Sequence, residues 1–95
     1  MKVKIEVVSA SEIYRVFVDT LEGFSTGLKP GVDLKKFIDK LFGIIMFWDR
    51  EMIDYSTTIH NSYVIEIDNR ETFRGVGVIP ERYKEFLALL REASL

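Results

Sequence analysis

An uncharged run of eight residues, from Leu41 to Trp48, constrains this chain more than any other segment. It ends abruptly at the charged residues 49–51. A membrane-spanning helix needs about 20 predominantly apolar residues, so this run is too short to cross a bilayer. It must therefore be buried inside the domain or against another protein.

The composition describes an ordered chain with few specialised residues. Its 95 residues, 47% of them hydrophobic, suit one α+β domain with a single core. Cysteine is absent, which excludes disulfides and thiolate chemistry and makes a cytoplasmic location the simplest interpretation. Glutamine is also absent and asparagine occurs only as Asn61 and Asn69, a depletion of thermolabile amides that is typical of thermophile chains. The net charge of −2 offers no basic surface for nucleic acid.

The first part of the chain predicts a strand followed by a helix. Polar and apolar residues alternate over Lys2–Val8, which indicates a half-buried strand. Ser9 and Glu12 have the spacing of a capping box, and apolar residues follow at helical intervals over 13–21. We therefore expect a first helix there, although the β-branched and aromatic residues of 14–18 favour a strand.

The uncharged run belongs to the predicted second helix. Asp33 is its expected N-cap, and the apolar stripe that begins at Leu34 stays in phase through Trp48 and Met52. The alternative is a helix that stops at Gly43, followed by a buried strand over 44–48. We favour the continuous helix because an interior glycine costs only about 1 kcal/mol relative to alanine.

The second half of the chain predicts three strands and a last helix. Alternating residues over 52–59 and 63–67 indicate two strands joined by a turn at residues 60–62. A third strand follows over 73–79, and Pro80 opens the last helix. The expected order is β-α-α-β-β-β-α, with an antiparallel sheet and the helices packed on one face.

The strand register follows from matching side chains. Placing Ile67 opposite Phe73 sets Tyr63 opposite Gly77 and Glu66 opposite Arg74, so that apolar residues meet on one face and opposite charges on the other. The outward face is then expected to carry Asp54, Ser56, Thr58, Glu66 and Arg74, with Met52, Val64, Val76 and Val78 among them.

No catalytic, metal or cofactor motif stands out. His60 is the only histidine, and it has neither a second histidine nor a cysteine with which to build a zinc site. The acidic residues near Asp49 lack the spacing of a calcium loop. The glycines of residues 74–78 lie in a strand pattern rather than in a phosphate-binding turn. We therefore expect a protein without cofactors that is not an enzyme.

The first functional hypothesis is a small protein-interaction domain that binds another protein or forms a homodimer. Aromatic residues and methionine are enriched in interface cores, and contiguous exposed apolar patches are usually functional. The candidate interface residues are Phe47, Trp48, Val64, Val76 and Val78.

The second hypothesis is a small-molecule-binding protein with its pocket between helices and sheet. Two glycines on one face of a strand leave a notch, which more often admits a packed side chain than a ligand. The candidate ligand-binding residues are Tyr55, His60, Tyr63, Gly75 and Gly77, with Trp48 as a further wall. A weaker alternative is an acidic regulator that covers the basic surface of a nucleic-acid-binding partner.

Overall fold

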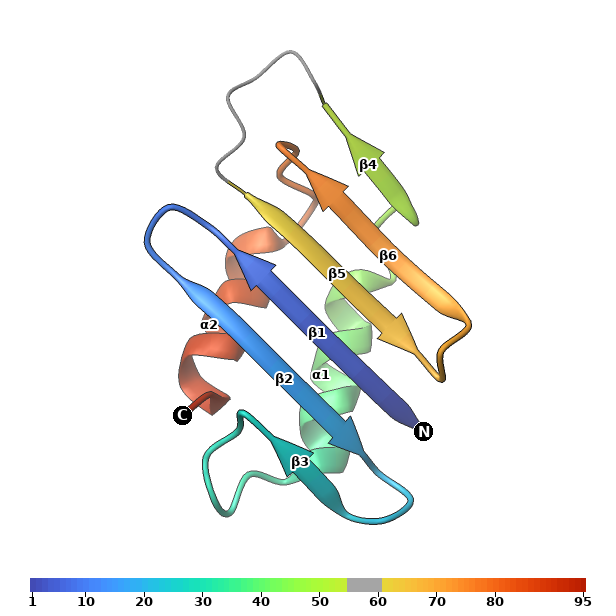
Figure 1. The fold of residues 1–95 in the computed structure, drawn as a ribbon, viewed down its shortest axis with the longest axis vertical. Coiled ribbons are helices and arrows are strands. Elements are labelled where there is room, and N and C mark those ends of the chain that lie inside the picture. The colour runs from blue at the N-terminus through green and yellow to red at the C-terminus, as the bar shows by residue number, and fades with distance from the viewer. Residues whose placement is uncertain (55–60) are drawn as a thin grey trace.

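The computed structural model describes residues 1–54 and 61–95, without the side chains of Glu71 and Thr72. Within these residues the chain forms a mixed six-stranded sheet and two helices, and both helices lie on the same side of the sheet (Figure 1). We call that side the inner face and the opposite side the outer face. The strand order is β3-β2-β1-β5-β6-β4. The elements are β1 (Lys2–Val8), β2 (Ile13–Asp19), β3 (Phe24–Thr26), α1 (Leu34–Ile45), β4 (Glu51–Ile53), β5 (Ser62–Ile67), β6 (Glu71–Val76) and α2 (Tyr83–Ala93).

The predicted α+β fold with helices on one face is confirmed, but the first predicted helix is wrong. Residues 13–19 form strand β2, antiparallel to β1. Ser9 and Glu12 do bond to each other, but they close a β-hairpin: the Ser9 amide donates to the Glu12 main-chain carbonyl at 2.8 Å, and the Glu12 amide donates to Ser9 Oγ at 3.0 Å. Only the second of these bonds belongs to a capping box, in which the glutamate side chain would accept from the serine amide. The β-branched and aromatic residues of 14–18 determine the outcome, with Val16 and Val18 buried.

The second predicted helix is confirmed at its start and wrong at its end. Asp33 caps α1 by accepting a hydrogen bond from the Lys36 amide at 3.1 Å. The helix ends at Ile45, so it does not continue to Met52, and residues 44–48 do not form a strand either. The chain turns after α1, with the Trp48 amide bonded to the Ile45 carbonyl at 2.9 Å. This turn lets residues 51–53 reach the edge of the sheet.

Strand β4 makes the sheet mixed rather than antiparallel. It pairs in parallel with β6, whereas a hairpin between residues 52–59 and β5 was expected. Residues 55–60, which include most of that predicted strand and part of its turn, lie outside the described residues. The pairing of Met52 with Gly75 places Met52 on the inner face, and the pairing of Ile53 with Val76 places Ile53 on the outer face. The expected outward position of Met52 is therefore wrong.

The antiparallel pairing of β5 and β6 is confirmed, with a register that differs by two residues. Phe73 lies opposite Ile65 rather than Ile67. The loop is shorter than expected because Asp68 and Asn69 both adopt positive φ, at 51° and 59°, and the Arg70 amide donates to the Ile67 carbonyl at 3.0 Å. A shift of two residues keeps every side chain on its predicted face.

The core lies between the inner face of the sheet and the two helices. The last helix is confirmed, but it begins at Tyr83 and not at Pro80, because Arg82 precedes it as N-cap with a positive φ of 58°. Tyr83, Phe86 and Leu90 are buried. Trp48 also belongs to this core. Its ring centroid lies 4.9 Å from that of Tyr63 and 5.0 Å from that of Phe86. Its indole Nε1 donates to the Glu81 carbonyl at 2.5 Å.

Gly75 is required by the packing of Tyr63. The two residues are cross-strand partners, and a Cβ built at Gly75 would lie 2.2 Å from Cε1 of Tyr63. Because Tyr63 is buried, its ring has no free space into which it can move. Gly43, in helix α1, has nothing within 4 Å of a built Cβ.

We predict opposite effects for the same substitution at these two glycines. Gly75→Ala should lower the free energy of unfolding by about 1–3 kcal/mol because it overpacks the core. Gly43→Ala should raise it by roughly 0.5–1 kcal/mol because alanine is the better helix former. Urea denaturation measures both, and equal effects at the two sites would contradict the packing of Tyr63 on Gly75.

A charged cluster fastens the β1–β2 hairpin to α2. Arg91 donates to Glu12 through Nε and also through Nη2, the latter at 2.8 Å, and the Tyr14 hydroxyl donates to Glu12 Oε1 at 2.8 Å. The hydrogen bonds from Arg91 and Tyr14 lower the pKa of the Glu12 carboxyl to about 2.

This cluster should make part of the stability depend on pH. The Glu12 pKa is lower in the folded chain than its ordinary value of 4.5, so the stabilisation is fully present above pH 4.5 and is lost as pH falls through about 2. Glu12→Gln should therefore reduce the loss of stability between these two pH values. Urea unfolding across a pH series measures this, with Glu22→Gln as the exposed control. A pH dependence identical to that of the wild-type protein would show that the cluster contributes nothing.

Candidate interaction surface

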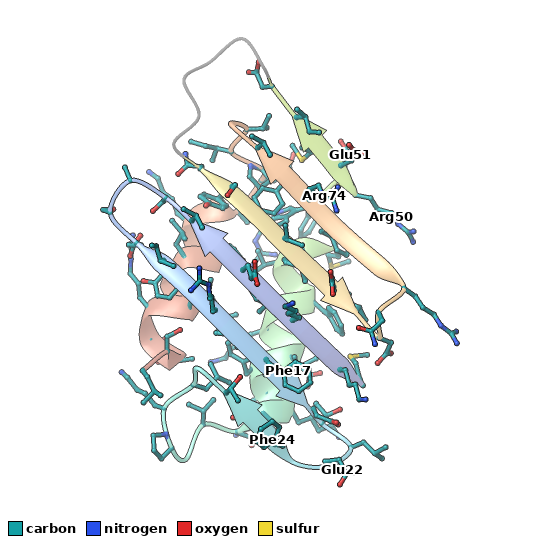
Figure 2. All side chains as sticks on the ribbon, viewed as in Figure 1. Phe17, Glu22, Phe24, Arg50, Glu51 and Arg74 are labelled. Atoms are coloured by element: carbon teal, nitrogen blue, oxygen red, sulfur yellow. The ribbon has the colours of Figure 1, made fainter. Side chains whose placement is uncertain are left out.

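The outer face of the sheet carries an exposed, ordered pattern of side chains. Figure 2 views this face, with Phe17 of β2, Arg74 of β6 and Glu51 of β4 labelled on it. In β1 the inner residues Val3, Ile5 and Val7 are buried, and the residues between them are exposed. Because both helices of the described ranges lie on the inner face, this pattern faces away from the core.

One row of this surface carries no charge across five strands, and every residue in it except Ser62 is aliphatic. The register places Ile13 beside Val8, Val8 beside Ser62, Ser62 beside Val76, and Val76 beside Ile53. We call this set the apolar row. Ile13 is 62% exposed and Val8 is 45% exposed, while the other three residues are half-buried by their neighbours. Exposed apolar residues that adjoin in this way are typical of binding surfaces.

The next row alternates in charge. Arg15 lies beside Glu6, Glu6 beside Val64, Val64 beside Arg74, and Arg74 beside Glu51. We call this set the charged row. Neighbouring charges are of opposite sign wherever two charges adjoin, so the row presents no patch of one sign.

The rest of the outer face continues the mixture. Lys4 lies opposite both Phe17 and Glu66, and its Nζ is 3.9 Å from the carboxylate of Glu6. The rings of Phe17 and Phe24 have centroids 6.2 Å apart at the β3 edge. Aromatic and aliphatic side chains thus lie at both ends of the strands, with the charges between them.

The five predicted interface residues fall into two groups. Val64 and Val76 are half-buried on the outer face, and Val78, also half-buried, follows β6. Phe47 is exposed beside the helices, where the Arg82 guanidinium lies 5.3 Å from its ring centroid. Trp48 is only 7% exposed and belongs to the core. Of the five, only Val64 and Val76 therefore belong to the two rows.

The predicted ligand-binding residues do not form an open notch. Tyr55 and His60 lie outside the described residues. The Tyr63 ring fills the space over Gly75, and Gly77 lies beyond the end of β6 with a φ of 75°. Burial raises the pKa of the Tyr63 hydroxyl to about 12, so this phenol stays protonated at neutral pH.

A hollow of about 730 Å³ lies elsewhere, between α1 and the β5–β6 hairpin. Most of its lining is apolar, and one charged pair of residues lies beside it. The lining residues are Met1, Phe42, Ile45, Met46, Ile67, Asp68, Arg70 and Phe73. Its size is within the range of small-molecule sites.

Metal-ligating clusters and membrane-spanning helices are both absent from the described part of the chain. Residues 1–54 and 61–95 contain no group of three histidine, cysteine or acidic side chains placed to hold a metal ion. Neither helix in these ranges has the length and apolar character that crossing a bilayer requires.

The prediction missed Val8, Ile13, Arg15 and Ile53 as surface residues. Ile13 and Arg15 were assigned to a helix, so their positions beside Val8 and Glu6 were hidden. The signal that would have found Ile13 and Arg15 is the run of β-branched and aromatic residues over 14–18, which favours a strand.

The chain matches no family model, no curated protein and no solved structure.

Proposed function

We propose that this protein is a non-enzymatic interaction domain that binds proteins, including a second copy of itself, through the outer face of its sheet. The observation that carries the proposal is the apolar row, which runs across β2, β1, β5, β6 and β4 without a charge. An isolated exposed apolar residue is ordinary, whereas aliphatic residues gathered in one uncharged row, with Ile13 and Val8 well exposed, are typical of a binding surface.

The charged row suits the same function. Each of its charges already has an opposite neighbour on the same sheet, such as Arg15 with Glu6 and Arg74 with Glu51. A partner that presents alternating charges can pair with this row, and a partner with a wrong pattern meets like charges. The apolar row then contributes affinity, and the charged row contributes specificity.

Val76 lies in the apolar row and tests the proposal directly. We predict that Val76→Lys abolishes self-association, because it places a charge in the middle of the buried contact. The fold should survive, since Val76 is half-buried on the outer face and outside the core. Sedimentation velocity measures the association, and circular dichroism checks the fold.

The matched control is Ala88→Lys, which adds the same side chain to an exposed position on α2. It should leave the association unchanged. A wild-type protein that sediments only at 11.0 kDa, or a Val76→Lys variant that associates as the wild-type protein does, would contradict the proposal.

The hollow beside α1 favours a second candidate function, the binding of a small apolar molecule. We predict that such a ligand would raise the unfolding temperature, because a ligand at a hundredfold its dissociation constant adds about 2.7 kcal/mol of stability. A thermal-shift screen of metabolites measures this. Replacing Phe42, which lines the hollow, with aspartate should abolish any true shift. A screen without a shift, or a shift that the Phe42→Asp variant retains, would argue against the hollow as a site.

A further inference from the structure

We propose that a second copy of the chain docks on the outer face with the two-fold axis of the dimer running along β5. This inference rests on the proposed function and adds the geometry of the contact. It follows from the order of the side chains in the two rows. Two copies related by an axis parallel to β5 place β5 against β5, β1 against β6, and β2 against β4.

The apolar row has the same order of side-chain types in both directions from its centre. Across the sheet its order is Ile13, Val8, Ser62, Val76 and Ile53, with Ser62 of β5 at the centre. Under the proposed axis, Ile13 of one copy faces Ile53 of the other, and Val8 faces Val76. The small Ser62 faces its own counterpart. Aliphatic side chains therefore meet aliphatic side chains on both sides of the axis.

The charged row reverses its sign about the same centre. Its order is Arg15, Glu6, Val64, Arg74 and Glu51, with Val64 of β5 in the middle. The axis sets Arg15 of one copy against Glu51 of the other, and Glu6 against Arg74. Each of these pairs occurs twice in the dimer, and Val64 meets Val64 on the axis.

The position of the axis is selected by the charges. An axis between β1 and β5 would place Arg15 of one copy against Arg74 of the other, which are like charges. An axis between β5 and β6 would likewise place Glu6 against Glu51. An axis along β5 matches both rows together. Electrostatic complementarity of this kind sets register and excludes wrong arrangements, because like charges in contact cost several kcal/mol.

One pair on the axis is unfavourable and is locally compensated. The register places Glu66 of one copy near Glu66 of the other. Within each copy, Lys4 is the cross-strand partner of Glu66 on β1. The two lysines thus flank the two carboxylates and offset their repulsion.

The arrangement agrees with the known packing of sheets. Two face-to-face sheets lie about 10 Å apart, with their strands aligned to within about 30°. The residues nearest the axis then face each other most directly, and those are the residues of β5, β1 and β6. The pair formed by Glu6 and Arg74 is therefore the better test of the register than the pair formed by Arg15 and Glu51.

The axis can be tested by reversing the charge at each of two facing positions in separate variants and then mixing the two variants. Glu6→Arg alone sets the introduced arginine against Arg74 at both contacts, and Arg74→Glu alone sets the introduced glutamate against Glu6. Each variant alone should dimerise more weakly by on the order of tenfold or more. Mixed in equal amounts, the two variants should form a heterodimer in which both contacts pair an arginine with a glutamate.

The pairing in that mixture follows from the two-fold symmetry. At one contact position 6 of the first variant faces position 74 of the second, and both carry the introduced charges, arginine against glutamate. At the other contact Arg74 of the first variant faces Glu6 of the second, as in the wild-type protein. Every facing pair is again one arginine and one glutamate, so the heterodimer should have nearly wild-type affinity. Native mass spectrometry with one variant isotopically labelled identifies it.

The control and the second pair keep this test decisive. Lys84→Glu reverses an exposed charge on α2 and should change nothing. If either variant at Glu6 or Arg74 fails to fold, Arg15→Glu mixed with Glu51→Arg obeys the same logic. Single reversals without effect, or a mixture that stays as weak as its components, would overturn the proposed axis.

Cysteine crosslinking gives an independent readout, because the chain has no cysteine of its own. Ser62→Cys places two thiols on the axis and should crosslink efficiently with a bismaleimide of short spacer. Glu51→Cys places them on opposite sides, separated by about 19 Å laterally at about 4.8 Å per strand, and should not crosslink. The reverse result would exclude an axis along β5.

These outcomes separate the geometry from the function. If Val76→Lys abolishes association, but mixing Glu6→Arg with Arg74→Glu does not restore wild-type affinity, the outer face remains the contact and the proposed axis is rejected. Association that survives Val76→Lys would reject the outer face itself.

Discussion

The one-sided burial of strand β1 is the constraint on which the rest of the structure depends. Val3, Ile5 and Val7 have no solvent exposure, whereas the residues between them are exposed. Because β1 pairs with both β2 and β5, its alternation determines which face of each neighbour turns inward. Both helices pack on that inner face, and the opposite face is left with its two rows (Figure 1).

The sequence allowed much of this fold to be predicted where one local signal acted alone. The alternation of β1, the Asp33 cap and the presence of a last helix after Pro80 were predicted correctly, although that helix begins at Tyr83 and not at Pro80. The failures came where two signals competed. Ser9 and Glu12 share one bond with a capping box, from the Glu12 amide to Ser9 Oγ, but the Ser9 amide donates to the Glu12 main-chain carbonyl and closes a β-hairpin instead. The position of β4 depended on a parallel pairing with β6 that no local pattern indicates.

The candidate surface was predictable only in part for the same reason. Val64 and Val76 were placed outward because the period of a strand survives a two-residue shift in register. The rows themselves require β2 and β4, and one of these was predicted as a helix and the other as an antiparallel strand. Trp48 was chosen from its chemistry as an interface residue, yet its contacts with Tyr63 and Phe86 place it in the core.

The central claim is that the outer face is a contact between two copies of the chain. Amide spectra of the wild-type protein, recorded by NMR above and below the concentration at which it associates, test it most directly. We expect changes at Glu6, Ser62, Val64 and Arg74, with the amides of α1 and α2 unaffected. Changes confined to the helices, or spectra that do not depend on concentration, would contradict the claim.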